Sequence, residues 1–208
     1  MIADSSGNYQ HMILKRSFKM EDVRSDVSLV EKEFENLILT SKHYIAKRAD
    51  EEISFMKNNI YALNQKLDAV ISRLKEEGDS KRLVILRVLK KVTYKLQTTI
   101  HLLEQIKNYR PFYREMDIPR MVDILLSDIR SLIYYDDKFA SLEKLESDLK
   151  TIDSLQEQHR RVLITFLMQS WVNLKEVLIL MKIGEIYKNI AEELVDIFLF
   201  MELLEERP

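Results

Sequence analysis

Apolar residues recur at steps of three and four through most of this 208-residue chain. In an α-helix that spacing places them on one face, where a neighbouring helix can cover them. The pattern starts near Met20, and we expect either a break near Arg48–Asp50 or one long helix that runs through this point. Beyond it the steps alternate as they do in a heptad seam between paired helices. The seam consists of Ala49, Ile53, Met56, Ile60, Leu63, Leu67, Val70 and Leu74.

Single residues predict where the next helices end and begin. Gly78 can supply the left-handed conformation that ends a helix, and Asp79 or Ser80 can cap the helix that follows. That third helix should end before Pro111, because the residue before a proline disfavours the helical conformation. Asp117 is the predicted cap of a fourth helix.

The fifth and sixth helices are predicted to meet at Ser154. Apolar residues at helical spacing run from Phe139 to Ile152. Ser154 and Glu157 then fit a capping box, in which the two side chains satisfy free amide groups at the start of a helix. The sixth helix would run from there to about Glu205.

These boundaries predict an all-α protein, a pair of antiparallel three-helix bundles related by a pseudo-repeat. Residues 1–19 would form a flexible tail, residues 20–110 a first three-helix unit, and residues 115–208 a second. A shift of the chain by 77 residues supports the repeat, because it superimposes apolar positions of the two halves. The superimposed pairs include Leu86 with Leu163, Leu89 with Phe166, Ile100 with Val177, and Leu103 with Leu180.

The composition agrees with a helical bundle. The chain has only 3 Gly and 3 Pro, which are too few turn residues for an all-β or α/β fold. Its 32 Lys and Arg nearly balance its 34 Asp and Glu, which argues against a nucleic-acid partner bound through a broad basic face. The absence of cysteine excludes disulfides, thiolate metal sites and cysteine nucleophiles, and it fits a cytoplasmic protein.

The best candidate for a membrane-spanning segment is Val162–Met181. Asn173, Lys175 and Glu176 interrupt it near the middle, where charge is costly in lipid. We interpret the segment as a helix that is buried on most sides within a bundle. No signal peptide is visible, so we expect a soluble protein that is peripheral to the membrane at most.

No arrangement of residues predicts catalysis. The chain contains neither a G-x-x-x-x-G-K-[ST] loop nor a G-x-S-x-G elbow. A carboxylate-bridged di-metal enzyme would need Glu-x-x-His pairs, and His43, His101 and His159 follow Thr or Gln at that spacing instead. We therefore expect a protein that is not an enzyme, with its histidines in solvent or in the core.

One stretch carries a resemblance to a known family. Residues Lys182–Val195 read KIGEIYKNIAEELV, which resembles the signature helix of the PhoU family, ERIGDHAxNIAE. Residues 103–108, LEQIKN, look like the same family's LERIGD. The resemblance implies two three-helix bundles, each with an E-x-x-x-D motif on its third helix that holds metal ions in the family. The matching residues of the signature are Ile183, Gly184, Asn189, Ile190, Ala191 and Glu192, with Lys182 for Arg and Glu185 for Asp.

The acidic motifs depart from the family pattern. Glu104 keeps the first Glu but Asn108 replaces its Asp, while Met181 replaces the second Glu and Glu185 keeps an acid. Oxygen side chains four residues apart share one helix face, where they can ligate a divalent metal. We predict weak binding of a divalent metal at Glu104, Asn108, Glu185 and Asn189, or none. The alternative is that these are ordinary solvated helix residues.

By resemblance, the chain would be a non-enzymatic regulator of phosphate uptake or signalling. Its partner would be a protein, either a phosphate transporter subunit or its sensor kinase, and a homodimer is compatible with this interpretation. The alternative function is a helical adaptor or self-associating structural protein unrelated to phosphate. In that case the seam from Ala49 to Leu74 would join copies of the chain.

Overall fold

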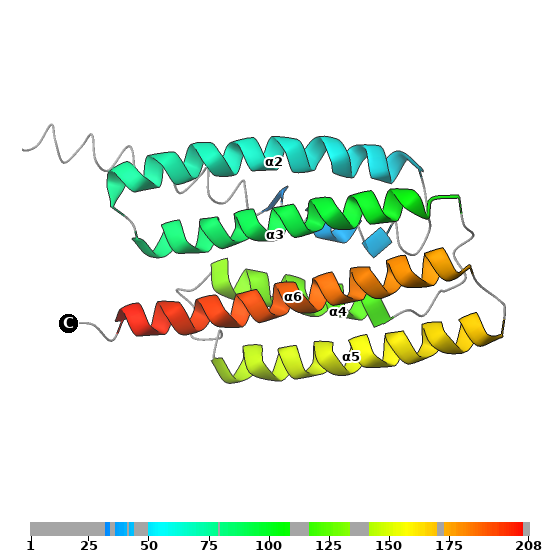
Figure 1. The fold of residues 1–208 in the computed structure, drawn as a ribbon. Helices are drawn as coiled ribbons and strands as arrows, with labels where there is room; N and C mark the ends of the chain where they lie inside the picture. The colour runs from blue at the N-terminus through cyan, green and yellow to red at the C-terminus, as the bar shows by residue number, and fades with distance from the viewer. Residues whose placement is uncertain are drawn as a thin grey trace, which may run out of the picture.

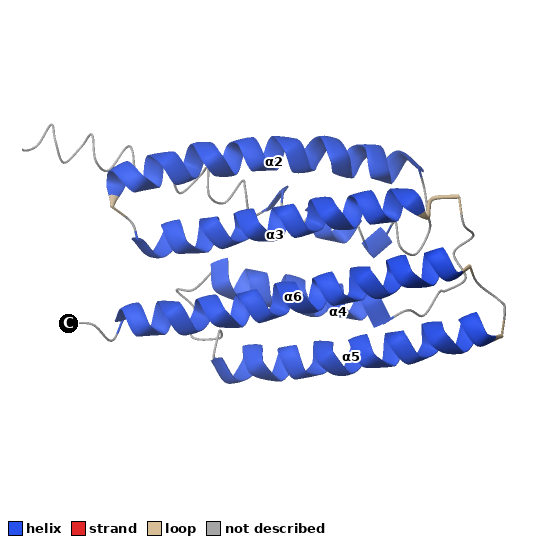
Figure 2. Cartoon of the chain, in the orientation of Figure 1, coloured by secondary structure: helices blue, strands red, loops and turns tan. Residues whose placement is uncertain are grey.

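The computed structural model describes residues 32–33, 36–40, 42–43, 50–78, 80–108, 117–133, 142–169 and 173–205. All regular structure in these residues is helical (Figure 2), which confirms the predicted all-α class. The long helices are α2 (Asp50–Glu77), α3 (Ser80–Gln105), α4 (Asp117–Ile133), α5 (Leu142–Met168) and α6 (Leu174–Glu205).

The long helices form a layer with one helix behind it. Helices α2, α3, α6 and α5 lie side by side in that order (Figure 1), and each neighbouring pair is in contact. Helix α4 lies behind this layer and packs against α5 and α6. Because α4, α5 and α6 each contact the other two, they form a three-helix bundle, and the contact between α3 and α6 joins it to the first half of the chain.

The predicted first helix falls mostly outside the described residues, as do the tail over residues 1–19 and the boundary before Pro111. Its described parts, residues 32–33, 36–40 and 42–43, are helical. Leu37 and Ile38 are buried in the same core as the long helices. Lys42 Nζ lies 2.5 Å from Asp123 Oδ1 of α4, so this segment reaches the second half of the chain.

The heptad seam lies inside the chain and not on its surface. Met56 and Leu63 have no exposed area, and the other apolar seam positions from Ile53 to Leu74 are buried as well. A surface that is already covered by the same chain cannot join two copies. The proposed self-association through this seam is therefore wrong, and the seam is the core-facing side of α2.

Helix α2 ends where Gly78 was predicted to end it. Gly78 has a φ of 78°, and its N–H donates to the carbonyl oxygen of Leu74 at 3.0 Å. This is the left-handed helix cap in which glycine avoids the steric cost that other residues meet. Helix α3 begins two residues later at Ser80, as expected.

The predicted boundary at Ser154 is wrong. Helix α5 runs through this residue, whose hydroxyl donates to the carbonyl oxygen of Lys150 at 3.0 Å. A cap contributes only ~1 kcal/mol. Continuing the helix buries Leu155, His159 and Leu163, which outweighs it.

The true boundary lies between Met168, where α5 ends, and Leu174, where α6 begins. Asn173 Oδ1 accepts a hydrogen bond from the Lys175 N–H at 2.8 Å, so Asn173 is the N-cap of α6. The break interrupts the former membrane candidate, and no helix in the described parts of the chain has the length and apolar character that crossing a membrane requires. It also overturns the 77-residue register, which lays α3 across the end of α5, the turn and the start of α6.

Replacing Gly78 with alanine tests the α2 cap. A Cβ at this position meets no atom within 4 Å, so the cost comes from the backbone conformation alone. We expect Gly78→Ala to lower the free energy of unfolding in urea by about 1 kcal/mol. An unchanged or higher stability would contradict the left-handed cap.

Candidate functional site at the α3–α6 interface

Helices α3 and α6 run in opposite directions along their contact. Lys95, in the middle of α3, donates from Nζ to the backbone oxygen of Asn189 at 2.9 Å and lies 3.2 Å from Glu193 Oε1. Ten residues further along α3, Gln105 lies beside Lys175 and Lys182, near the start of α6. One ammonium group therefore ties the two halves of the chain together by a hydrogen bond and an ion pair.

The segment Lys182–Val195 lies wholly within α6, and most of its apolar residues pack in the core. Ile183, Tyr187 and Ile190 have no exposed area. Gly184 faces α5, where a Cβ would lie 3.4 Å from Cδ2 of His159. That distance is close to ordinary van der Waals contact, so the spacing of the two helices leaves little room beyond a methyl group at this position.

The first predicted metal motif is split by the end of α3. Glu104 lies in the last turn, where Lys57 Nζ of α2 approaches its Oε1 to 2.6 Å. The hydrogen bond from Lys57 lowers the pKa of Glu104, so this carboxylate is held in its charged form. Asn108 is exposed in the turn that follows the helix.

The second predicted motif lies along α6. Glu185 pairs with Lys182 one turn before it, with Nζ and Oε2 2.9 Å apart, and both side chains are about half exposed. Asn189 is half-buried, and its backbone oxygen is the one that Lys95 contacts. Glu104 thus forms an ion pair with Lys57 of α2, and Glu185 forms one with Lys182 of its own helix.

These donors do not fit a resident divalent metal. Calcium takes six to eight oxygen ligands and magnesium demands an octahedral set. The described residues contain no group of three or more His, Asp or Glu that could hold a metal ion. Metal binding at Glu104, Asn108, Glu185 and Asn189 stays a prediction, and lysine ammonium groups provide the positive charge beside both acids.

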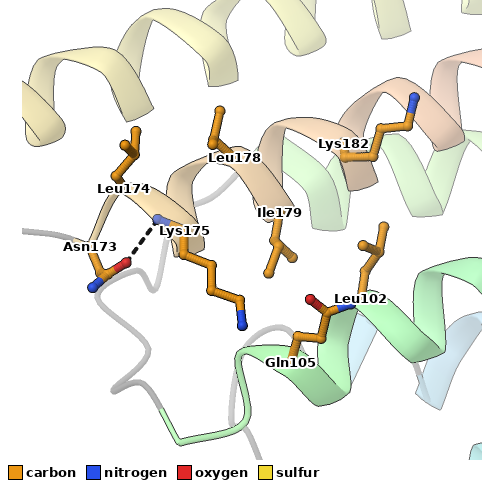
Figure 3. Close-up of a pocket in the computed structure, with 8 residues that line it drawn as sticks. All are labelled: Leu102, Gln105, Asn173, Leu174, Lys175, Leu178, Ile179 and Lys182. Carbon is orange, nitrogen blue, oxygen red and sulfur yellow. Dashed lines mark hydrogen bonds between the residues drawn. The ribbon is translucent and has the colours of Figure 1, made fainter.

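A groove of about 500 Å³ lies where the end of α3 meets the start of α6 (Figure 3). Its lining is mostly apolar, with two lysines and two amides but no carboxylate. Leu174 and Leu178 are 55% and 56% exposed although they are large and apolar. The lining residues are Leu102, Gln105, Asn173, Leu174, Lys175, Leu178, Ile179 and Lys182.

The sequence interpretation missed this groove because it placed a continuous helix across residues 154–205. The signal that would have found it is Asn173 followed three residues later by Glu176, which is a capping-box pattern at the start of α6. With α6 beginning at Leu174, residues of its first turns line the groove together with Leu102 and Gln105 of α3.

Two titratable side chains, Asp128 and His159, are buried in the second bundle. Asp128 of α4 is 2% exposed and lies 3.0 Å from Lys144 Nζ of α5, which is also 3.0 Å from Asp148 Oδ2. Burial raises the pKa of Asp128 to about 7 despite the lysine. Burial also lowers the pKa of His159 to about 4, so this histidine is neutral in the core.

The fold is similar to that of one solved structure. No family model matches the chain, and no curated protein matches it. The crystal structure of the phosphate transport system regulatory protein PhoU from Streptococcus pneumoniae aligns with a TM-score of 0.62, over 87% of this chain and 92% of that one. At 14% identity, the likeness shows that the two proteins share a fold.

Replacing Asp128 with asparagine should change how stability depends on pH. Between the ordinary aspartate pKa of 3.8 and about 7, the folded chain binds the proton more tightly than the unfolded chain does. The contribution of Asp128 to the free energy of unfolding of the parent protein therefore falls as pH rises, by at most about 1.4 kcal/mol per pH unit. We expect the stability of Asp128→Asn relative to the parent, measured in urea, to rise from pH 5 to pH 7. A difference that is constant with pH would contradict the burial of this carboxyl.

The pKa of His159 predicts the opposite dependence. Below pH 6.5 the unfolded chain takes up the histidine proton, while the folded chain resists it down to about pH 4, so acidification destabilises the fold. His159→Gln cannot titrate but keeps an N–H that can donate to the carbonyl oxygen of Leu180, which lies 3.4 Å from His159 Nε2. We expect its stability relative to the parent to rise between pH 7 and pH 5. A fall over that range would show that His159 charges readily in the folded state.

Proposed function

We propose that this chain is a non-enzymatic, PhoU-like regulator of phosphate uptake or signalling that acts by binding a protein. The observation that carries the proposal is the shared fold with a phosphate transport regulator over 87% of the chain. The segment KIGEIYKNIAEELV adds to it, because it lies within the last helix of the second bundle, where the family's signature helix would lie.

The partner in this proposal is a phosphate transporter subunit or its sensor kinase. A helical bundle recognises a protein through exposed apolar anchors bordered by charge. The start of α6 offers such anchors in Leu174 and Leu178, with Lys175 and Lys182 beside them. Binding from the cytoplasmic side of the membrane would suit both partners.

A bound metal is not needed for this function. The charge of Glu104 is matched by Lys57, and that of Glu185 by Lys182. Regulation would follow from which surfaces the partner covers, and the acidic motifs would contribute to the stability and charge of those surfaces.

The proposal is tested in the host organism with a tagged copy of the full chain. We expect affinity capture from membranes and cytosol to recover a phosphate transporter subunit or its sensor kinase, identified by mass spectrometry. We also expect deletion of the gene to change the rate of phosphate uptake, and the wild-type chain to restore it.

A matched pair of variants sharpens this test. Glu104→Gln with Glu185→Gln removes both motif acids, and Glu143→Gln with Glu146→Gln removes two exposed acids of α5 as a control. Because each motif acid is already paired with a lysine, we expect both double variants to restore uptake. Recovery of an unrelated assembly, together with unchanged uptake in the deletion strain, would overturn the proposed function.

A further inference from the structure

The start of α6 leaves apolar surface uncovered beside a groove. Single exposed apolar residues are normal on a protein surface. Leu174 and Leu178 differ because they occupy successive turns of one helix and line the same groove as the buried Ile179. This arrangement is a row of anchors along a groove, and such a row is what helix-binding surfaces present.

The charged residues that line the groove have one sign. Lys175 and Lys182 line it, and the lining contains no carboxylate. The Lys182–Glu185 pair is exposed, and such pairs contribute little, so the Lys182 ammonium can exchange partners. Within the part of the chain that the structure describes, the Lys175 side chain forms no ion pair. Figure 3 shows Lys175 extending toward Gln105 of α3, and Lys182 pointing to the other side of α6.

We propose that this groove binds an acidic amphipathic helix of a partner protein. The lining of α6 runs from Asn173 to Lys182, which is about 14 Å of helix and matches two to three turns of a ligand helix. Two aliphatic side chains one turn apart on the ligand would pack between Leu174 and Leu178. Carboxylates that flank these side chains would meet Lys175 and Lys182, while Gln105 can donate to or accept from the ligand's polar edge.

The observations favour a helix over a lipid surface. Membrane binding through charge contributes about 1 kcal/mol per lysine and needs a cluster of them, whereas this groove presents two. The groove is lined from both α3 and α6, by Leu102 and Ile179 among others, so a ligand helix can lie along it.

The inference rests on the proposed function for the identity of the partner, but its chemistry can be tested separately. The probe is a synthetic helical peptide of about 15 residues, with leucines at i, i+4, i+7 and i+11 and glutamates at the flanking positions. A second peptide carries lysine in place of every glutamate. Binding to the full chain is measured by the fluorescence anisotropy of a labelled peptide.

We expect the acidic peptide to bind saturably and the lysine peptide to bind at least about tenfold more weakly. The variant Lys175→Glu with Lys182→Glu should weaken binding of the acidic peptide by about tenfold or more, because it reverses the charge of the groove. The control variant, Lys75→Glu with Lys150→Glu, makes the same change in net charge at exposed positions of α2 and α5, and should bind as the parent does. Leu178→Ala should weaken binding of the acidic peptide. It should also weaken the part of this binding that persists at high salt, because that part comes from apolar contact.

Several outcomes would overturn the inference. The first two are that the acidic peptide does not bind saturably, or that the control variant weakens peptide binding as much as the groove variant does. The third is that the chain forms concentration-dependent dimers in sedimentation that Leu178→Asp abolishes. The fourth is that the chain binds anionic phospholipid vesicles through Lys175 and Lys182. If the captured phosphate-system protein still binds the groove variant, the groove is not its binding site, and the proposed function stands. If the acidic peptide binds as expected but no phosphate-system protein is captured, the proposed function is wrong, and the binding of an acidic helix in the groove stands.

Discussion

The structure depends on the burial of α6, which is apolar around most of its circumference. Such a helix is stable in water only if neighbours cover it on several sides. Helices α3, α4 and α5 all contact it, and its central residues Ile183, Tyr187 and Ile190 have no exposed area. Because α3 belongs to the first half of the chain and the other two to the second, covering α6 is also what joins the halves.

Polar contacts specify how this cover is arranged. Lys95 fixes the register of α3 on α6 through Asn189 and Glu193, and Gly184 packs against His159 of α5. The cover is incomplete at the start of α6, where α3 ends near Gln105 while α6 continues past it to Leu174. The groove is therefore a consequence of unequal helix lengths at a shared interface, and its exposed leucines are the uncovered part of the same apolar helix.

Much of the fold could be predicted from local signals, and the failure at Ser154 shows their limit. Gly78 was sufficient to place the end of α2, since a left-handed residue forces the chain out of the helix. Ser154 and Glu157 only permit a helix to start, and the burial of Leu155 and Leu163 decides otherwise. The cap at Asn173 was a signal of the same kind, but it lay inside an apolar run that looked continuous.

The site was less predictable because its properties depend on contacts between distant segments. The sequence places Glu104 and Glu185 on helices, but it does not reveal that Lys57, 47 residues away, pairs with Glu104. The seam from Ile53 to Leu74 likewise looks the same whether it faces another copy or the same chain. Only the positions of α3 and the segment around Leu37 show that it is internal.

The measurement that tests this account most directly is native-state hydrogen exchange on the full chain, followed residue by residue along α6. Amides from Ile183 to Leu194 should exchange only through global unfolding, and the amide of Leu178 should exchange faster because this residue is exposed to solvent. Uniform exchange along α6, or faster exchange at its centre than at its start, would contradict the claim that the covered centre of α6 holds the two halves together.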